Sequence, residues 1–172
     1  MIVRQERPED VAAIDAVLRD AFGDEGDLVL RLVGGIRASP EAIPELALVA
    51  EDDTGIVGHT MLSWVGLEGG PRERLLVLTP LAVRGDRQRR GVGSQLAEAL
   101  IALAEEAGEP LIVVEGVPEY YPRFGFERAS TLGIERPHEK IPDAAFMVRR
   151  LTAYDPAVRG RVVYPPAFDF LY

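Results

Sequence analysis

The sequence predicts a mixed α/β fold in which a mostly antiparallel central sheet carries helices on both faces. Two β-like runs, 46–51 and 56–65, are joined by Asp-Asp-Thr-Gly at 52–55, a hairpin signature because glycine readily adopts a positive φ. A third apolar run, 75–83, leads into a helical pattern and then a buried strand, which indicates one β-α-β crossover. This combination fits neither a doubly wound parallel sheet nor a β-sandwich.

Two helices are predicted after a first strand at 1–6. The first begins at 8–10, where a proline and two acids occupy the first turn, and its apolar residues keep helical spacing until Gly23. The second covers about 27–36, although Gly34-Gly35 weakens its end. Both helices precede the β-like runs.

The remaining predicted elements lie in the second half of the chain. Residues 91–107 form an amphipathic helix that Gly108 ends, and 111–114 is a short buried strand. A helical turn at 118–124 and a late strand at 144–151 follow. The predicted order is β-α-α-β-β-β-α-β-α-β-β.

Length and composition predict one soluble domain, 1–172, because 172 residues with 47% hydrophobic content suffice for one core. A formal net charge of -9 opposes long-range attraction to nucleic acid or to an anionic membrane. The absence of cysteine excludes disulfides, thiolate metal sites and cysteine nucleophiles, and two histidines disfavour a histidine-rich metal site. With no signal-peptide core and no apolar run of membrane-spanning length, we expect a cytoplasmic protein without a metal.

One segment reverses the acidic balance of the chain. Residues 84–90 carry four arginines and one aspartate immediately before Gly91. A cation at a helix N-terminus is unfavourable by roughly 0.3–1 kcal/mol, whereas a bound phosphate accepts the free N–H groups and pairs with the arginines. Gly91 and Gly93 allow close approach because they lack Cβ. The loop therefore favours a phosphate-bearing ligand; the alternative is a solvated arginine-rich loop whose glycines serve packing.

Two familiar phosphate loops do not fit this segment. A Walker A loop needs Gly-Lys-Ser/Thr, but Gly93 is followed by Ser94 and Gln95. A dinucleotide-binding fingerprint needs a third glycine where the chain has Leu96. A phosphate-binding loop at this position would therefore belong to another class.

Two motifs about 30 residues apart resemble the GCN5-related N-acetyltransferase (GNAT) family. Gln-Arg-Arg-Gly-Val-Gly at 88–93 matches the family's Gln/Arg-x-x-Gly-x-Gly/Ala signature after the strand end Leu-Ala-Val at 81–83. Glu-Tyr-Tyr-Pro-Arg-Phe-Gly-Phe at 119–126 looks like its Tyr-x-x-x-Gly-Phe motif. The tail at 163–168, Val-Tyr-Pro-Pro-Ala-Phe, resembles the subgroup of predicted acetyltransferases typified by YhbS.

This resemblance implies an N-acetyltransferase that transfers the acetyl group of acetyl-CoA, its cosubstrate, to a primary amine of a small molecule, peptide or protein. It implies that loop amides hold the CoA pyrophosphate and that the pantetheine arm adds to the preceding strand as an extra strand would. The cofactor-binding residues so implied are Leu81, Ala82, Val83, Gln88, Arg89, Arg90, Gly91, Val92, Gly93, Ser94 and Tyr121.

The same resemblance makes Tyr121, four residues before Gly125, the general acid that protonates the departing thiolate. The alternative is a packing tyrosine whose hydroxyl only hydrogen-bonds the cofactor sulfur. The resemblance implies no fixed general base, since the family often uses ordered water. Some members use a glutamate on the strand equivalent to 75–83, which has no carboxylate here, and the candidate residues of this chain are His59 and Glu115. Their alternatives are a structural histidine and a solvated strand-end charge.

Two rival functions remain open at this stage: a non-catalytic acyl-CoA-binding or sensing module, and a binder of another phosphate ligand. The resemblance implies a homodimer as a common assembly, and the apolar tail segments 162–164 and 167–168 suit packing on the domain or on a second subunit.

Overall fold

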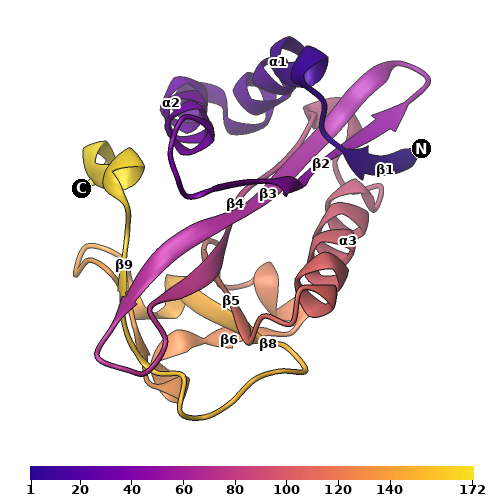
Figure 1. The fold of residues 1–172 in the computed structure, drawn as a ribbon. Helices are drawn as coiled ribbons and strands as arrows, with labels where there is room; N and C mark the ends of the chain where they lie inside the picture. Colours follow the sequence, from indigo (N-terminus) through magenta and orange to yellow (C-terminus); the bar gives the residue numbers. More distant parts are fainter. The chain divides into compact units, whose positions relative to one another are not determined.

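The computed structural model describes all of residues 1–172, whose contacts divide them into two compact units. The first unit contains 1–62 and 79–102, and the second contains 63–78 and 103–172. Strands β3 (Gly55–Glu68) and β4 (Arg74–Val83) run from one unit into the other. Figure 1 follows the elements along the chain.

In the first unit, β1 (Ile2–Gln5) pairs antiparallel with β2 (Ala42–Asp52), and the strand order continues through β3 to β4. Helices α1 (Val11–Phe22) and α2 (Gly26–Arg37) connect β1 to β2. Gly23 ends α1 with a φ of 54°, which confirms the predicted stop. The two predicted N-terminal helices are thus both present.

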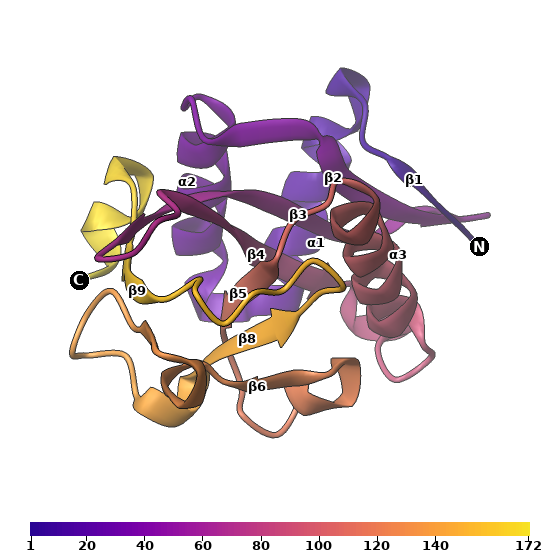
Figure 2. The same cartoon turned by 60° about the horizontal axis from the view of Figure 1, so that its bottom comes forward.

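Helix α3 (Val92–Glu106) follows β4 and lies on the other face of this sheet from α1 and α2. A Cβ on Gly58 of β3 would lie 2.8 Å from Leu96 Cδ1, so this residue faces α3. The next residue, His59, contacts Glu6, which also holds Arg37 at the end of α2. Because successive strand residues point to opposite faces, the sheet is covered on both sides (Figure 2). The predicted helices on both faces are confirmed.

In the second unit, β4 pairs in parallel with β5 (Leu111–Glu115), and β8 (Phe146–Arg150) lies antiparallel between β5 and β6 (Phe126–Arg128). The end of β3 pairs antiparallel with β9 (Gly160–Val163), which pairs in parallel with the two-residue β7 (Ile134–Glu135). The predicted β-α-β crossover is the passage from β4 through α3 to β5. The mostly antiparallel sheet is confirmed.

The sequence did not locate β6, β7 and β9, which contain two to four residues each. Segments this short show no hydrophobic periodicity, so only their partners in the sheet define them. The helical turn expected at 118–124 is a 3-10 helix, η4 (Tyr121–Phe124), and the chain closes with another, η7 (Pro166–Leu171). The apolar tail residues Val162 and Phe168 are buried within this unit.

The helices of the chain are too short or too polar for any of them to cross a membrane.

Candidate active site

The arginine-rich segment of the first unit forms a tight loop that opens into α3. Arg89 has a φ of 61° and Gly91 a φ of 84°, both in the left-handed region. The first hydrogen bond into α3 runs from Gln95 N to Gly91 O, so the N–H groups of 92–94 have no backbone acceptor. A Cβ on Gly91 would meet no atom within 4 Å. Open space therefore lies beside Gly91, next to these free amides, which suits an anion site.

Two of the four loop arginines are already paired with carboxylates. Arg84 Nε donates to Asp86 Oδ1 at 2.6 Å, and Arg87 Nε donates to Asp52 Oδ2 at 2.8 Å. Hydrogen bonds from Thr54 and then from Arg87 hold the pKa of the Asp52 carboxyl below its usual range. Arg89 and Arg90, by contrast, are exposed and form no ion pair. Only these two remain available to a phosphate.

The end of β4 keeps one edge without a strand partner. Its parallel pairing with β5 stops at Val77, opposite Val113. Arg84 N donates to Val57 O on β3, so the alternating backbone groups of Leu81 and Val83 face away from β3. Gln88 Nε2 donates to Val83 O at 3.0 Å and ties the loop to this strand end. An extended ligand arm could add along this edge.

His59 of β3 is fully buried in the first unit and has an exposed fraction of 0%. Its Nε2 lies 2.7 Å from Glu6 Oε2, and Arg37 Nη2 donates to the same oxygen at 3.0 Å. Nδ1 is buried and has no hydrogen-bond partner. Burial lowers the pKa of His59 despite the opposing effect of Glu6, so the ring is neutral. This setting favours the structural alternative for His59, because no substrate reaches a sealed imidazole.

Tyr121 begins η4 in the second unit and is held by rings on two sides. Its ring lies 5.2 Å from Tyr120 and 5.6 Å from Phe126, both edge-to-face. A Cβ on Gly116 would lie 2.3 Å from Tyr121 Cε2, so the ring rests directly on that backbone. The hydroxyl forms no hydrogen bond within the protein and is not sealed from solvent. Burial of the ring, with a smaller effect of Tyr120, raises the pKa of Tyr121 to about 12.

The local structure explains why the Tyr-x-x-x-Gly-Phe motif contains a glycine. Gly125 ends η4 with a φ of 82°, and a Cβ there would lie 2.8 Å from Arg149 Nε. That nitrogen donates to Phe124 O at 2.9 Å and closes the turn. The turn then delivers the buried Phe126 against Tyr121. The motif therefore fixes the position of the tyrosine ring.

Glu115 is exposed at the end of β5, directly before Gly116. Its Oε2 accepts hydrogen bonds from Tyr164 Oη at 3.0 Å and from Tyr172 Oη at 2.5 Å. Burial raises the pKa of both phenols, and the charge of Glu115 adds to this effect, so both remain donors. Tyr164 and Tyr172 could not be linked to Glu115 from the sequence, since they lie 49 and 57 residues away from it.

Within each unit, the structure brings some predicted residues together and separates others. In the first, Gln88 joins 89–94 to the strand end 81–83, whereas His59 contacts Glu6. In the second, the backbone of Gly116, which directly follows Glu115, contacts the ring of Tyr121. No group of three or more histidine, aspartate or glutamate side chains is arranged to hold a metal ion.

The chain belongs to the GNAT family of acetyltransferases. The family model described as acetyltransferase (GNAT) domain matches residues 44–128. The uncharacterized N-acetyltransferase YhbS of Escherichia coli K12 is 34% identical over 161 residues, which are 93% of this chain and 92% of YhbS. The N-acetyltransferase YjhQ of the same organism is 33% identical over 160 residues, 89% of this chain and 86% of YjhQ.

Two solved structures agree with this assignment. YhbS from Escherichia coli in complex with CoA matches with a TM-score of 0.86 and 33% identity, covering 98% of this chain and 91% of YhbS. A GNAT acetyltransferase from Brucella melitensis in complex with acetyl-CoA matches with a TM-score of 0.75 and 31% identity, covering 98% and 97%. The family and the YhbS-like subgroup predicted from the motifs are both confirmed.

Proposed function

We propose that this chain transfers the acetyl group of acetyl-CoA to a primary amine. The observation that carries the proposal is the N-terminus of α3, where unpaired amides, two unpaired arginines and a glycine backbone open to solvent create an anion site. Relatives solved with CoA and with acetyl-CoA support the same cosubstrate. Their identity of 31–33% extends over 98% of this chain, which also supports treating 1–172 as one acetyltransferase domain.

The loop residues suit the CoA pyrophosphate for separate reasons. The N–H groups of Val92, Gly93 and Ser94 donate to phosphate oxygens, and the helix dipole favours the negative charge. Arg89 and Arg90 add charge-assisted hydrogen bonds. The absence of a Cβ at Gly91 keeps the approach open. Gln88 acts by a different route, because its hydrogen bond to Val83 O sets the loop against the strand end.

At the strand end, Leu81 and Val83 offer backbone groups to the pantetheine arm, with Ala82 between them buried in the unit. Such pairing would position the arm as an added strand. It needs no particular side chain at these three positions. Their contribution is the geometry of the main chain.

Bound acetyl-CoA supplies a thioester, and the reaction forms a C–N bond to the amine while the C–S bond breaks. The nitrogen loses one proton and the departing sulfur gains one. Tyr121 fits the second task, because its hydroxyl is free of protein partners and stays protonated at neutral pH with a pKa of about 12. Contacts with Gly116 and Phe126 hold the ring in place.

For the first task, Glu115 suits the amine proton better than His59. Glu115 is exposed, and its second carboxylate oxygen has no hydrogen-bond donor. His59 is sealed and already bound to Glu6. Glu115 accepts the proton directly or through one water. His59 supports the site by holding β3 to the helical layer.

The decisive experiment measures CoA release from acetyl-CoA across a panel of amines with a thiol-reactive dye. The chain has no cysteine, so every thiol detected is CoA. Amine-dependent release supports the proposal. Tight binding of acetyl-CoA without release by any amine supports the non-catalytic sensing module instead. Calorimetry with CoA and ATP completes the test, since a preference for ATP contradicts both CoA-based functions.

A further inference from the structure

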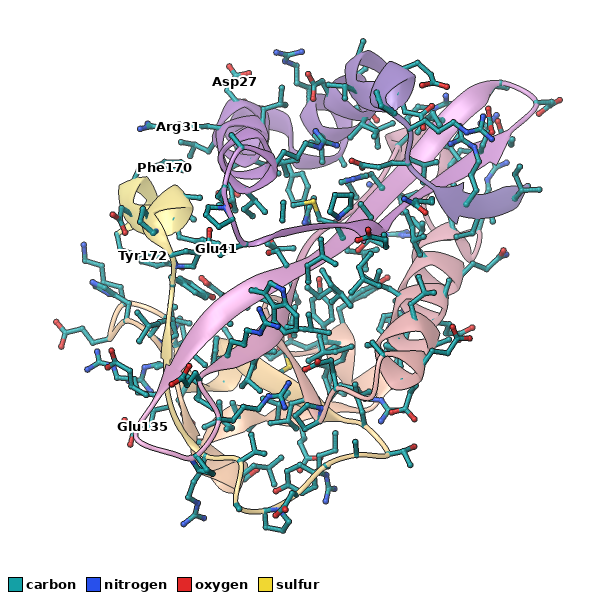
Figure 3. All side chains as sticks on the ribbon, in the orientation of Figure 1. Asp27, Arg31, Glu41, Glu135, Phe170 and Tyr172 are labelled. Atoms are coloured by element: carbon teal, nitrogen blue, oxygen red, sulfur yellow. The ribbon has the colours of Figure 1, made fainter.

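The second unit contains a pocket of about 450 Å³ that the family motifs do not account for. Its walls come from the end of β3, from β9, from η7 and from the segment around His138. Its volume lies in the range of small-molecule sites, roughly 300–1,000 Å³. Figure 3 shows Tyr172, one of its lining residues, on the C-terminal segment.

Aromatic rings form much of the lining. Tyr164 stacks on Phe168 with ring centroids 4.4 Å apart, and His138 stacks on Tyr172 with centroids 5.0 Å apart. These stacks give the pocket rigid apolar walls. Aromatic faces attract cations through their quadrupole, which suits an ammonium group on an apolar body.

Two of the three charged side chains that line the pocket are acidic. Glu68 and Asp169 line it, and both are exposed and form no ion pair. The one lining guanidinium, Arg161, donates to Pro137 O at 3.3 Å. Unpaired carboxylates of this kind attract a cation and repel a second carboxylate.

The pocket is also connected to the proposed catalytic groups within this unit. Tyr164 and Tyr172, which line it, both donate to Glu115 Oε2. Glu115 in turn precedes Gly116, on which the ring of Tyr121 rests. A ligand in the pocket would therefore contact two tyrosines whose hydroxyls donate to Glu115, the proposed acceptor of its proton.

We propose that this pocket binds the acetyl acceptor, and that the acceptor is a small cationic amine with an apolar body and no carboxylate. The inference rests on the proposed function for its chemistry, whereas binding of the amine in the pocket can be tested without the reaction. Phenethylamine and short aliphatic diamines represent the class. Amino acids represent the excluded class, because their carboxylate would meet Glu68 and Asp169.

The kinetic test compares wild type with the double variant Glu68→Gln, Asp169→Asn, both of which keep the size of the side chain. The amine KM should rise about tenfold, because the amine loses two ionic contacts of the strength usual for exposed groups. The Kd for acetyl-CoA should stay unchanged. Glu106→Gln is the matched control, since Glu106 is exposed in the same unit and does not line the pocket. An unchanged KM in the double variant overturns the proposal, as does a preference for amino acids or lysine peptides over small amines.

A binding test keeps the pocket separate from the activity. NMR saturation transfer to phenethylamine, without acetyl-CoA, should be strong for wild type and Glu106→Gln and weak for the double variant. If no amine releases CoA but this pattern holds, the acetyltransferase proposal fails and the pocket stands. If amines release CoA and phenethylamine shows no transfer in any variant, the pocket assignment fails and the acetyltransferase stands.

Discussion

Replacing Tyr121 with phenylalanine removes the proposed proton donor and leaves nearly everything else in place. The hydroxyl has no hydrogen-bond partner in the protein, so its loss should change the free energy of unfolding by no more than about 0.5 kcal/mol. The edge-to-face contacts with Tyr120 and Phe126 belong to the ring and persist. Any large effect on rate is therefore chemical.

The expected loss in kcat is about 100-fold. Removal of a positioned general acid costs roughly 10²–10⁴ in rate. The lower end applies here because a thiolate, with a thiol pKa of about 8.5, leaves with less need for protonation than an alkoxide or amide. A 100-fold loss corresponds to about 2.7 kcal/mol of activation free energy. The Kd for acetyl-CoA should change less than twofold, since the loop amides carry that binding.

The assay is CoA release at saturating acetyl-CoA and amine, with Tyr120→Phe as the control because the neighbouring hydroxyl also lacks a protein partner. With the pKa of Tyr121 at about 12, the wild-type rate should show no alkaline decline from this residue below about pH 11. A Tyr121→Phe variant with wild-type kcat would remove the hydroxyl from the mechanism. Equal losses in kcat and in acetyl-CoA affinity would assign it a binding role instead.

Three further predictions concern the loop, the ring support and the buried histidine. Arg89→Gly should weaken acetyl-CoA binding about fivefold by calorimetry, a loss of about 1 kcal/mol, and raise the melting temperature because glycine accepts the φ of 61° without strain. Gly116→Ala should lower kcat at least tenfold and destabilise the fold by about 1–3 kcal/mol, because its Cβ would lie 2.3 Å from Tyr121 Cε2. The melting temperature should fall between pH 7.5 and 5.5, because the lowered pKa of His59 lets the unfolded chain bind the extra proton first. Below about pH 4.5 Glu6 should add to this loss, since hydrogen bonds from His59 and Arg37 outweigh burial and lower its pKa.

Matched variants separate these effects from general damage. Arg19→Gln changes an exposed arginine on α1, so an equal loss of acetyl-CoA affinity there would contradict a specific role for Arg89. Gly34→Ala places a Cβ with no atom within 4 Å and should stabilise α2 by about 0.5–1 kcal/mol, in contrast to Gly116→Ala. His59→Gln should flatten the pH dependence between 7.5 and 5.5; a slope equal to wild type would assign the titration to another group.

Several site features could be predicted because their signals are local. The loop at 84–94 combines charge, glycine and a helix start within eleven residues, and each follows from the chemistry of neighbours in the chain. The glycine four residues after Tyr121 marks a left-handed turn, and Gly125 does adopt a φ of 82°. The long strands and three helices were found for the same reason, since period and end signals repeat within each.

Other features depend on pairs far apart in the chain. The state of His59 is decided by Glu6, 53 residues away, and by Arg37. Local spacing indicated only that this histidine lies on a strand. Whether it is a base or a buried anchor depends on which face the helices cover. The strands β6, β7 and β9 likewise have too few residues to carry a pattern of their own.

The class of fold, the arginine- and glycine-rich loop at 84–94 and the Tyr-x-x-x-Gly-Phe motif could be recognised from the sequence, because each depends on residues that are neighbours along the chain. The free arginines of the loop, the burial of His59 and the contacts of Glu115 could be known only from the folded chain. Arg87 pairs with Asp52 of β2, and Glu115 accepts hydrogen bonds from Tyr164 and Tyr172 of the tail. Such contacts follow from packing, and packing brings together residues whose separation in sequence carries no signal.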